Sequence, residues 1–189
     1  MFYRTRRMLG SAVYTPDGLL GALLDCLVDI GSGEIGGVAV DPGGLLPHHV
    51  LLVPREAIKA CDIAARRLDL SISREQALEL DTTPNELSLA RSVEGDTFQT
   101  RFQRLNRILD YRVVCKDGIA GTVSDFLIDP DGWSVRYLVV DSHELLPEHE
   151  VLIPVGWISE VNPKQEWVTI RVTVHRFRQS QHLLSTTTI

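Results

Sequence analysis

The chain has 189 residues, of which 44% are apolar and 23% charged, and its formal net charge is −6. This composition is typical of a globular protein with one or two domains. The acidic balance argues against a protein whose main task is to bind nucleic acid phosphates. No apolar run approaches the roughly 18 residues needed to span a bilayer. The N-terminus lacks the apolar region of a signal peptide, so we expect a cytoplasmic protein.

The three cysteines, Cys26, Cys61 and Cys115, are odd in number and form no CxxC motif. Cys26 and Cys61 lie among apolar neighbours, which favours buried, reduced thiols. A reactive thiol or a metal ligand is the alternative.

In the first half of the chain, apolar and β-branched residues form short runs separated by Gly, Pro and Asp, which is typical of strands joined by tight turns. The expected strands are Ala12–Tyr14, Ala22–Ile30, Ile35–Val40, Val50–Val53 and Leu68–Ile72. We expect residues 56–65 to form a short helical turn or bend. Ser73 and Gln76 have the spacing of a capping box and predict a short helix to about Leu80.

In the second half, the same kinds of run recur after a polar segment that contains Pro84 and Gly95. The expected strands are Val113–Cys115, Thr122–Ile128, Val135–Val140, Val151–Ile153 and Trp167–Val174. We expect residues 175–184 to form a short helix that is equivalent to residues 73–80, at an offset of 102.

The sequence matches itself at an offset of 100 residues without a gap. Between residues 2–58 and 102–158, 20 of 57 positions are identical. The identities fall on turn glycines, strand aspartates and loop prolines, which indicates a duplication, and the period is too long for a solenoid. Duplication of a dimerising ancestor predicts a monomer with two pseudo-symmetric copies, or a dimer. The sequence leaves open whether strands are exchanged between the copies.

The clearest unit of the repeat is the hairpin of residues 121–141. Its two runs of apolar and aromatic residues are joined by Asp129-Pro130-Asp131-Gly132. Pro130 presets its own φ, and we expect Gly132 to adopt a positive φ. Five or six such short strands per copy predict a small barrel or sandwich. We expect one copy at residues 1–80, a linker at 81–100, a second copy at 101–184 and a tail at 185–189.

Several segments of the chain resemble the PRC-barrel family. The resemblance rests on a G-x-V-x-D-hydrophobic-L-I-D strand (residues 121–129), a strand ending V-V-D at Asp141, and V-L-I-P ending at Pro154 with Trp157. The first copy is a weaker match, because Ala57 replaces the tryptophan and Gly36-Gly37 replaces Arg136-Tyr137. The resemblance implies an all-β fold with short helices, made of two tandem small antiparallel barrels. It implies docking onto larger assemblies, as in the cytoplasmic domain of the reaction-centre H subunit or the C-terminal domain of a ribosome-maturation factor. It also implies that the family has no shared catalytic residues.

Two sets of residues are candidates for chemistry. Asp25 with Asp29, and Asp125 with Asp129, lie four residues apart on strands, roughly 13 Å by strand rise. This separation is too large for a shared proton or a single metal ion, so we expect these aspartates to cap turns and strand ends. His49, His143 and His149 lie in two equivalent loops and would bind a transition metal if the loops met, but no pair has a metal-ligand spacing, so surface histidines are the better explanation.

The functional hypothesis is a non-enzymatic interaction module that needs no cofactor. It docks on a protein complex of unknown identity, for which a photosynthetic membrane complex is one candidate, and it would then lie at the cytoplasmic face of that membrane. Trp133, Trp157 and Tyr137 are the candidate interaction residues, because aromatic residues are enriched at interface cores. The alternatives are a metal- or ligand-binding sensor that uses the histidine loops, and a ribosome-associated factor.

Overall fold

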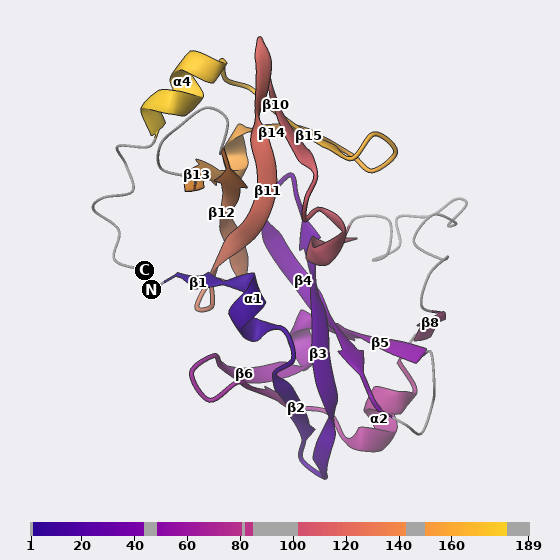
Figure 1. The fold of residues 1–189 in the computed structure, drawn as a ribbon. Coiled ribbons are helices and arrows are strands. Elements are labelled where there is room, and N and C mark those ends of the chain that lie inside the picture. The colour runs from indigo at the N-terminus through magenta and orange to yellow at the C-terminus, as the bar shows by residue number, and fades with distance from the viewer. Residues whose placement is uncertain (1, 44–48, 81, 85–101, 143–149, 181–189) are drawn as a thin grey trace. The chain divides into compact units, whose positions relative to one another are not determined.

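The computed structural model describes residues 2–43, 49–80, 82–84, 102–142 and 150–180 (Figure 1). This part of the chain is mostly β-structure with three short helices, which confirms the predicted all-β fold class. The helices are α1 (Thr5–Met8), α2 (Arg74–Leu78) and α4 (Val174–Gln179), and the 3-10 turns are η1 (Arg55–Ala57), η3 (Leu105–Arg107) and η4 (Val155–Trp157).

Contacts divide the chain into two compact units, neither of which is continuous in sequence. The first-copy unit comprises Arg6–Val28 and Ile35–Arg104. The second-copy unit comprises Met1–Thr5, Asp29–Glu34 and Leu105–Ile189. The second-copy unit therefore contains two short segments of the first copy, Met1–Thr5 and Asp29–Glu34, and the first-copy unit extends into the second copy as far as Arg104.

The strands follow the repeat closely. Those of the first copy are β1 (Tyr3–Arg4), β2 (Ala12–Thr15), β3 (Gly18–Asp29), β4 (Glu34–Asp41), β5 (His49–Pro54), β6 (Ile58–Asp62), β7 (Arg67–Leu70) and β8 (Thr82–Pro84). Those of the second are β9 (Gln103–Arg104), β10 (Arg112–Cys115), β11 (Gly118–Asp129), β12 (Ser134–Asp141), β13 (Glu150–Pro154), β14 (Ile158–Asn162) and β15 (Trp167–Ile170). Each element from β9 to α4 has a counterpart 100 residues earlier.

The two units have the same strand order. It is β6-β7-β2-β3-β4-β5 in the first-copy unit and β14-β15-β10-β11-β12-β13 in the second-copy unit. The described strands do not close into a complete barrel in either unit.

One pair in each unit departs from the predicted antiparallel arrangement. β2 pairs with β7, and β10 with β15, in parallel. The chain reverses direction at four turns between β2 and β7, while the single 3-10 turn η1 bends it from β5 into β6 without reversing it. An even number of reversals brings the last strand back parallel to the first.

A glycine near the start of the long strand of each copy, Gly21 or Gly121, is fixed by a backbone contact. A Cβ on Gly21 would lie 1.8 Å from the carbonyl oxygen of Asp41, and a Cβ on Gly121 would lie 2.0 Å from that of Asp141. Only glycine permits strands to approach this closely. The contact explains why both copies have glycine at this position.

Three local predictions are wrong. Residues 58–62 form the edge strand β6, and the sequence hides this because Lys59, Ala60 and Asp62 are all exposed and no alternation is visible. Helix α4 begins at Val174, so its offset from α2 is 100 residues and not 102. In the β11–β12 turn it is Trp133 that has a positive φ, of 45°, and not Gly132.

The predicted capping box is confirmed. Ser73 Oγ accepts a hydrogen bond from Gln76 N–H at 3.2 Å, and Gln76 Oε1 accepts one from Ser73 N–H at 2.9 Å. The predicted linker at 81–100 lies outside the described residues apart from β8, which pairs with β5. The predicted tail at 185–189 also lies outside them.

Candidate functional site: the N-terminal arm site

The N-terminal arm, residues 2–5, adds a short strand to the second-copy unit. In β1, Tyr3 pairs with Ile128 and Arg4 with Leu127, antiparallel to β11. The equivalent strand β9 pairs instead with β3, where Arg104 is opposite Leu27. The two copies have therefore exchanged their first strands, which answers a question that the sequence leaves open.

The aromatic ring of Phe2 anchors the arm. It meets the ring of Tyr137 edge-on, with centroids 5.6 Å apart and an interplanar angle of 79°. Phe2 also packs against a buried cluster of Leu127, Val139 and Leu152. Edge-to-face pairs of this kind add about 0.5–1.5 kcal/mol to the burial of the rings.

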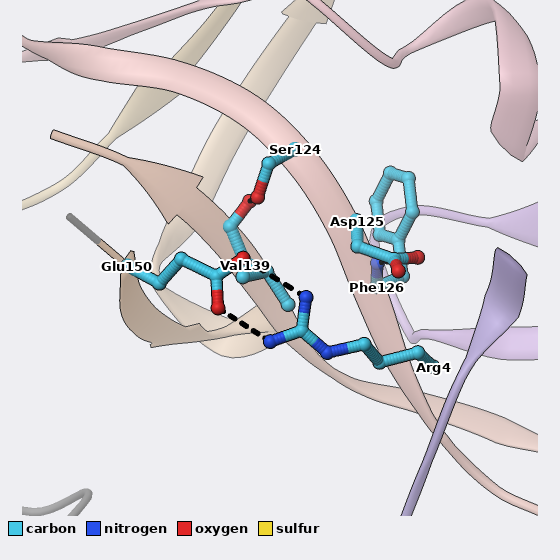
Figure 2. Close-up of polar contacts among 6 residues, drawn as sticks. All are labelled: Arg4, Ser124, Asp125, Phe126, Val139 and Glu150. Carbon is cyan, nitrogen blue, oxygen red and sulfur yellow. Dashed lines mark hydrogen bonds and ion pairs between the residues drawn. The ribbon is translucent and has the colours of Figure 1, made fainter. Parts of the chain in front are cut away.

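Arg4 carries the charge of the arm (Figure 2). Its guanidinium donates two hydrogen bonds to the carboxylate of Glu150, one from Nη1 to Oε1 at 2.9 Å and one from Nη2 to Oε2. These hydrogen bonds hold the pKa of Arg4 above its ordinary value, against the opposing effect of burial. The side chains of Arg4 and Glu150 are 29% and 43% exposed, so solvent screens the pair.

Thr5 makes the buried polar contact of the arm. Its hydroxyl donates to Asp125 Oδ1 at 2.5 Å, and the backbone N–H of Phe126 donates to the same oxygen at 2.8 Å. Asp125 is 1% exposed, and within the described chain its Oδ2 has no hydrogen-bond partner. Beside this carboxylate (Figure 2), Ser124 Oγ donates to the carbonyl oxygen of Val139 at 3.3 Å and ties β11 to β12.

The equivalent arm of the first-copy unit is held by apolar contacts. Phe102 is 7% exposed and belongs to a buried cluster formed with Leu27, Ala39, Val50 and Leu52. Its ring lies directly over Gly36, where an added Cβ would be 2.3 Å from Cζ. The Gly36-Gly37 pair that weakens the sequence signal of β4 thus makes room for this ring.

A second feature of the second-copy unit is an outward-facing apolar strip formed by Val114, Ile119 and Trp167. Val114 on β10 is opposite Ile119 on β11. Trp167 on β15 lies two residues before Thr169, which is the parallel partner of Val114. Ile119 and Trp167 are 55% and 37% exposed, and both are among the exposed large apolar residues of the described chain.

The same face of the first-copy unit is largely covered by charge. Tyr14 is opposite Leu19, which is 54% exposed. The guanidinium of Arg67 lies 4.1 Å from the centroid of the Tyr14 ring, and Arg67 also donates to the carboxylate of Asp69. Trp167 occupies the position that corresponds to Arg67, so the second copy has an exposed aromatic ring where the first has a cation stacked on one.

The described part of the structure does not place the predicted metal-binding histidines close together. His143 and His149 lie outside the described residues, and of His49 only its place at the start of β5 is described. Within the described ranges, no group of three or more His, Cys, Asp or Glu side chains is arranged to hold a metal ion. The metal hypothesis stays a prediction.

The predicted interaction residues are all half-buried. Trp133 lies in the β11–β12 turn, and Tyr137 contacts the arm through Phe2. Trp157 ends η4, where its carbonyl oxygen accepts a hydrogen bond from Arg171 N–H at 2.8 Å. Their proposed role in an interface stays a prediction.

The predicted capping role is confirmed for Asp29 and Asp129 and is wrong for Asp25 and Asp125, which are buried inside β3 and β11. Asp29 Oδ1 accepts from the N–H of Gly31 at 2.9 Å, and Asp129 Oδ1 accepts from that of Asp131 at 3.2 Å. The cysteines are free, with Cys26 and Cys115 buried and Cys61 half-buried. Burial raises the pKa of Cys26, and it raises the pKa values of Cys61 and Cys115 to about 11 each, so their thiols are protonated at neutral pH.

Residues 102–175 match the family model of the PRC-barrel domain. A search of curated proteins finds no match to the chain. The PRC-barrel domain begins at the second arm, yet in three dimensions that arm pairs with β3, and β1 takes its place on β11. None of the helices in the described residues is long and apolar enough to cross a membrane.

The sequence-based candidates do not include Thr5 and Glu150, which take part in the polar contacts of the arm site. Their signal lies in the self-alignment, where Leu105 replaces Thr5 and Val50 replaces Glu150. Both differences remove polar groups from the same site in one copy. Read together, they indicate that the two copies hold their arms by different chemistry.

Proposed function

We propose that the chain is a non-enzymatic interaction module made of two PRC barrels, the second at residues 102–175 and a diverged one in the first copy. In this proposal the module docks on a larger protein complex as an assembly or stabilising factor. The observation that carries the proposal is the apolar strip, because the exposed Ile119 and Trp167 and the half-buried Val114 place apolar side chains on one face of the PRC-barrel domain. Aromatic residues on such a surface are typical anchors of protein interfaces.

The repeat supports the assignment of the first copy as a second PRC barrel. Its strands pair in the same order as those of the PRC-barrel domain, and both copies have the glycine contact at the start of the long strand. The cation that covers Tyr14 in the first copy favours the second copy as the docking face.

Two cellular contexts fit a PRC-barrel module of this kind. One is a photosynthetic membrane complex, where the protein would be peripheral at the cytoplasmic face, and the other is the ribosome. The net charge of −6 favours the first, because a ribosomal RNA surface repels an acidic protein.

A cross-linked pull-down from the native cells tests the proposal, with soluble and membrane fractions kept apart. The variant Ile119→Ser removes an apolar side chain from the strip, and Leu19→Ser is the matched control at the equivalent, equally exposed position of the first copy. We expect both variants to fold, since exposed substitutions usually change stability by less than about 0.5 kcal/mol.

The expected result is a reproducible set of partner subunits that is lost with Ile119→Ser and retained with Leu19→Ser. Pigment-complex subunits in the membrane fraction would support the photosynthetic context, and ribosomal proteins the other. Equal capture by both variants would refute the apolar strip as the docking face.

A further inference from the structure

The N-terminal arm is held in the way that a peptide ligand is held by a sheet edge. Backbone pairing of Tyr3 and Arg4 with β11 positions an extended segment, and alternate side chains enter distinct subsites. Phe2 packs on Tyr137, while Arg4 pairs with Glu150. Strand addition with side-chain subsites is a common mode of peptide recognition.

Two residues of the arm site, Thr5 and Glu150, differ between the copies. Glu150 is replaced by Val50 in the first copy, and the residue that follows the arm arginine is Leu105 in place of Thr5. The site on β11 therefore distinguishes the two arms, although both begin with Phe-x-Arg. The pattern that it recognises is an aromatic anchor, an arginine two residues later and a hydroxyl residue directly after the arginine.

The contacts of the arm are few enough for it to be displaced. Only two residues pair through the backbone, Phe2 is half-buried, and the ion pair of Arg4 is open to solvent. Thr5 satisfies one oxygen of the buried Asp125 carboxylate and leaves the other without a hydrogen bond in the described structure. Short strands with few buried contacts open far more readily than a core.

We propose that this arm site is a peptide-binding site for an extended segment of a partner protein with the pattern Phe-x-Arg-Thr, and that the chain's own arm is a built-in competitor. The arm raises the concentration of partner needed for binding, because the partner binds only molecules whose site is open. Tethering makes the arm a strong competitor, since a short tether gives an effective concentration in the millimolar range. The site is distinct from the apolar strip, so the proposal does not depend on the docking face argued above.

Fluorescence anisotropy with a labelled peptide of residues 2–9 tests the proposal on the full chain. The variant Phe2→Ala weakens the arm in place and leaves the site intact. We expect it to bind the peptide about tenfold more tightly than the wild type, because a larger fraction of its molecules have an open site. Arg4→Gln weakens the arm through its exposed ion pair, so it provides the same test if Phe2→Ala fails to fold.

Three controls make the result specific to this site. Phe102→Ala weakens the other arm and should leave the affinity for the peptide of residues 2–9 unchanged. A labelled peptide of residues 102–109 should bind more weakly, because it has Leu105 where the site accepts a hydroxyl. Glu150→Gln, combined with Phe2→Ala, should lower the affinity several-fold and reduce its dependence on salt.

The proposal fails if Phe2→Ala and Arg4→Gln bind the peptide no more tightly than the wild type does. It also fails if a peptide with alanine in place of the phenylalanine binds equally well. A concentration-dependent dimer of the wild type that the free peptide dissociates would support it and identify the arm of a second copy as an occupant.

Discussion

The two arms of this chain share a backbone pairing, a phenylalanine anchor and an aliphatic cluster at equivalent positions, but they differ in the other residues around the anchor. Phe102 fills an apolar pocket over Gly36, whereas Phe2 lies partly exposed against Tyr137, beside an ion pair and a buried hydroxyl–carboxylate hydrogen bond. One site is a buried apolar core, and the other is a partly exposed site with polar contacts. A repeated strand thus need not keep a repeated role.

The difference also explains why the exchange of arms is unambiguous. Thr5 meets the buried carboxylate of Asp125, and Arg4 meets Glu150. In the first copy, Val50 stands where Glu150 stands in the second, so an unexchanged Arg4 would lose that partner. Complementary side chains specify which arm binds where, as polar residues specify partners in other strand and helix pairings.

The largest expected effect comes from truncating the two anchors. Phe102→Ala should lower the free energy of unfolding by about 3–5 kcal/mol, because it empties a buried pocket. Phe2→Ala should cost clearly less, since the Phe2 side chain is only half-buried. Chemical denaturation of both variants measures the difference, and equal losses would contradict the contrast between a core site and a recognition site.

Filling the space under Phe102 is the next test. Gly36→Ala places a Cβ about 2.3 Å from the ring, and we expect a loss of about 3 kcal/mol, at the upper end for overpacking. Arg136→Ala changes the equivalent exposed position of the second copy and serves as the control. Combining Gly36→Ala with Phe102→Leu should recover part of the loss, and strict additivity of the two changes would contradict direct contact.

Thr5→Val removes the buried hydrogen bond of the polar site at nearly constant volume. Asp125 Oδ1 would keep only the N–H of Phe126, so we expect the free energy of unfolding to fall by about 2 kcal/mol, the cost of leaving a buried acceptor poorly satisfied. Thr5→Ser keeps the hydroxyl and should cost much less. Thermal unfolding of the two variants provides the measurement, and equal destabilisation would show that the methyl group of Thr5, and not its hydroxyl, stabilises the arm.

Much of the fold follows from local sequence. The Asp-Gly turns, the long hairpin of each copy and the capping box at Ser73 are determined by residues close together in the chain, so their patterns predict them. The edge strand β6 escaped prediction because exposed residues such as Lys59 and Ala60 leave no alternating pattern. Its pairing with β7 overrides the weak local preference.

The contacts of the arm site cannot be predicted from residues that are close together in the sequence. Arg4 and Glu150 are 146 residues apart, and Thr5 and Asp125 are 120 residues apart. Both arms carry Phe-x-Arg, so the backbone pattern fits either copy equally well. The only discriminating signal is a pair of differences between the copies, and its meaning depends on a three-dimensional contact that the sequence does not reveal.

The smallest expected effect on stability comes from the ion pair, and it separates stability from specificity. Arg4→Met and Glu150→Gln should each lower the free energy of unfolding by less than about 1 kcal/mol, because both side chains are partly exposed and an exposed pair is screened by water and salt. The double variant shows whether the two effects are coupled, and the coupling should shrink as salt is raised from low to physiological concentration. A coupling that persists in high salt would mean that the pair is shielded from solvent. Arg4 would then fix the arm as firmly as Phe102 fixes its counterpart, and the contrast between the two arms would no longer hold.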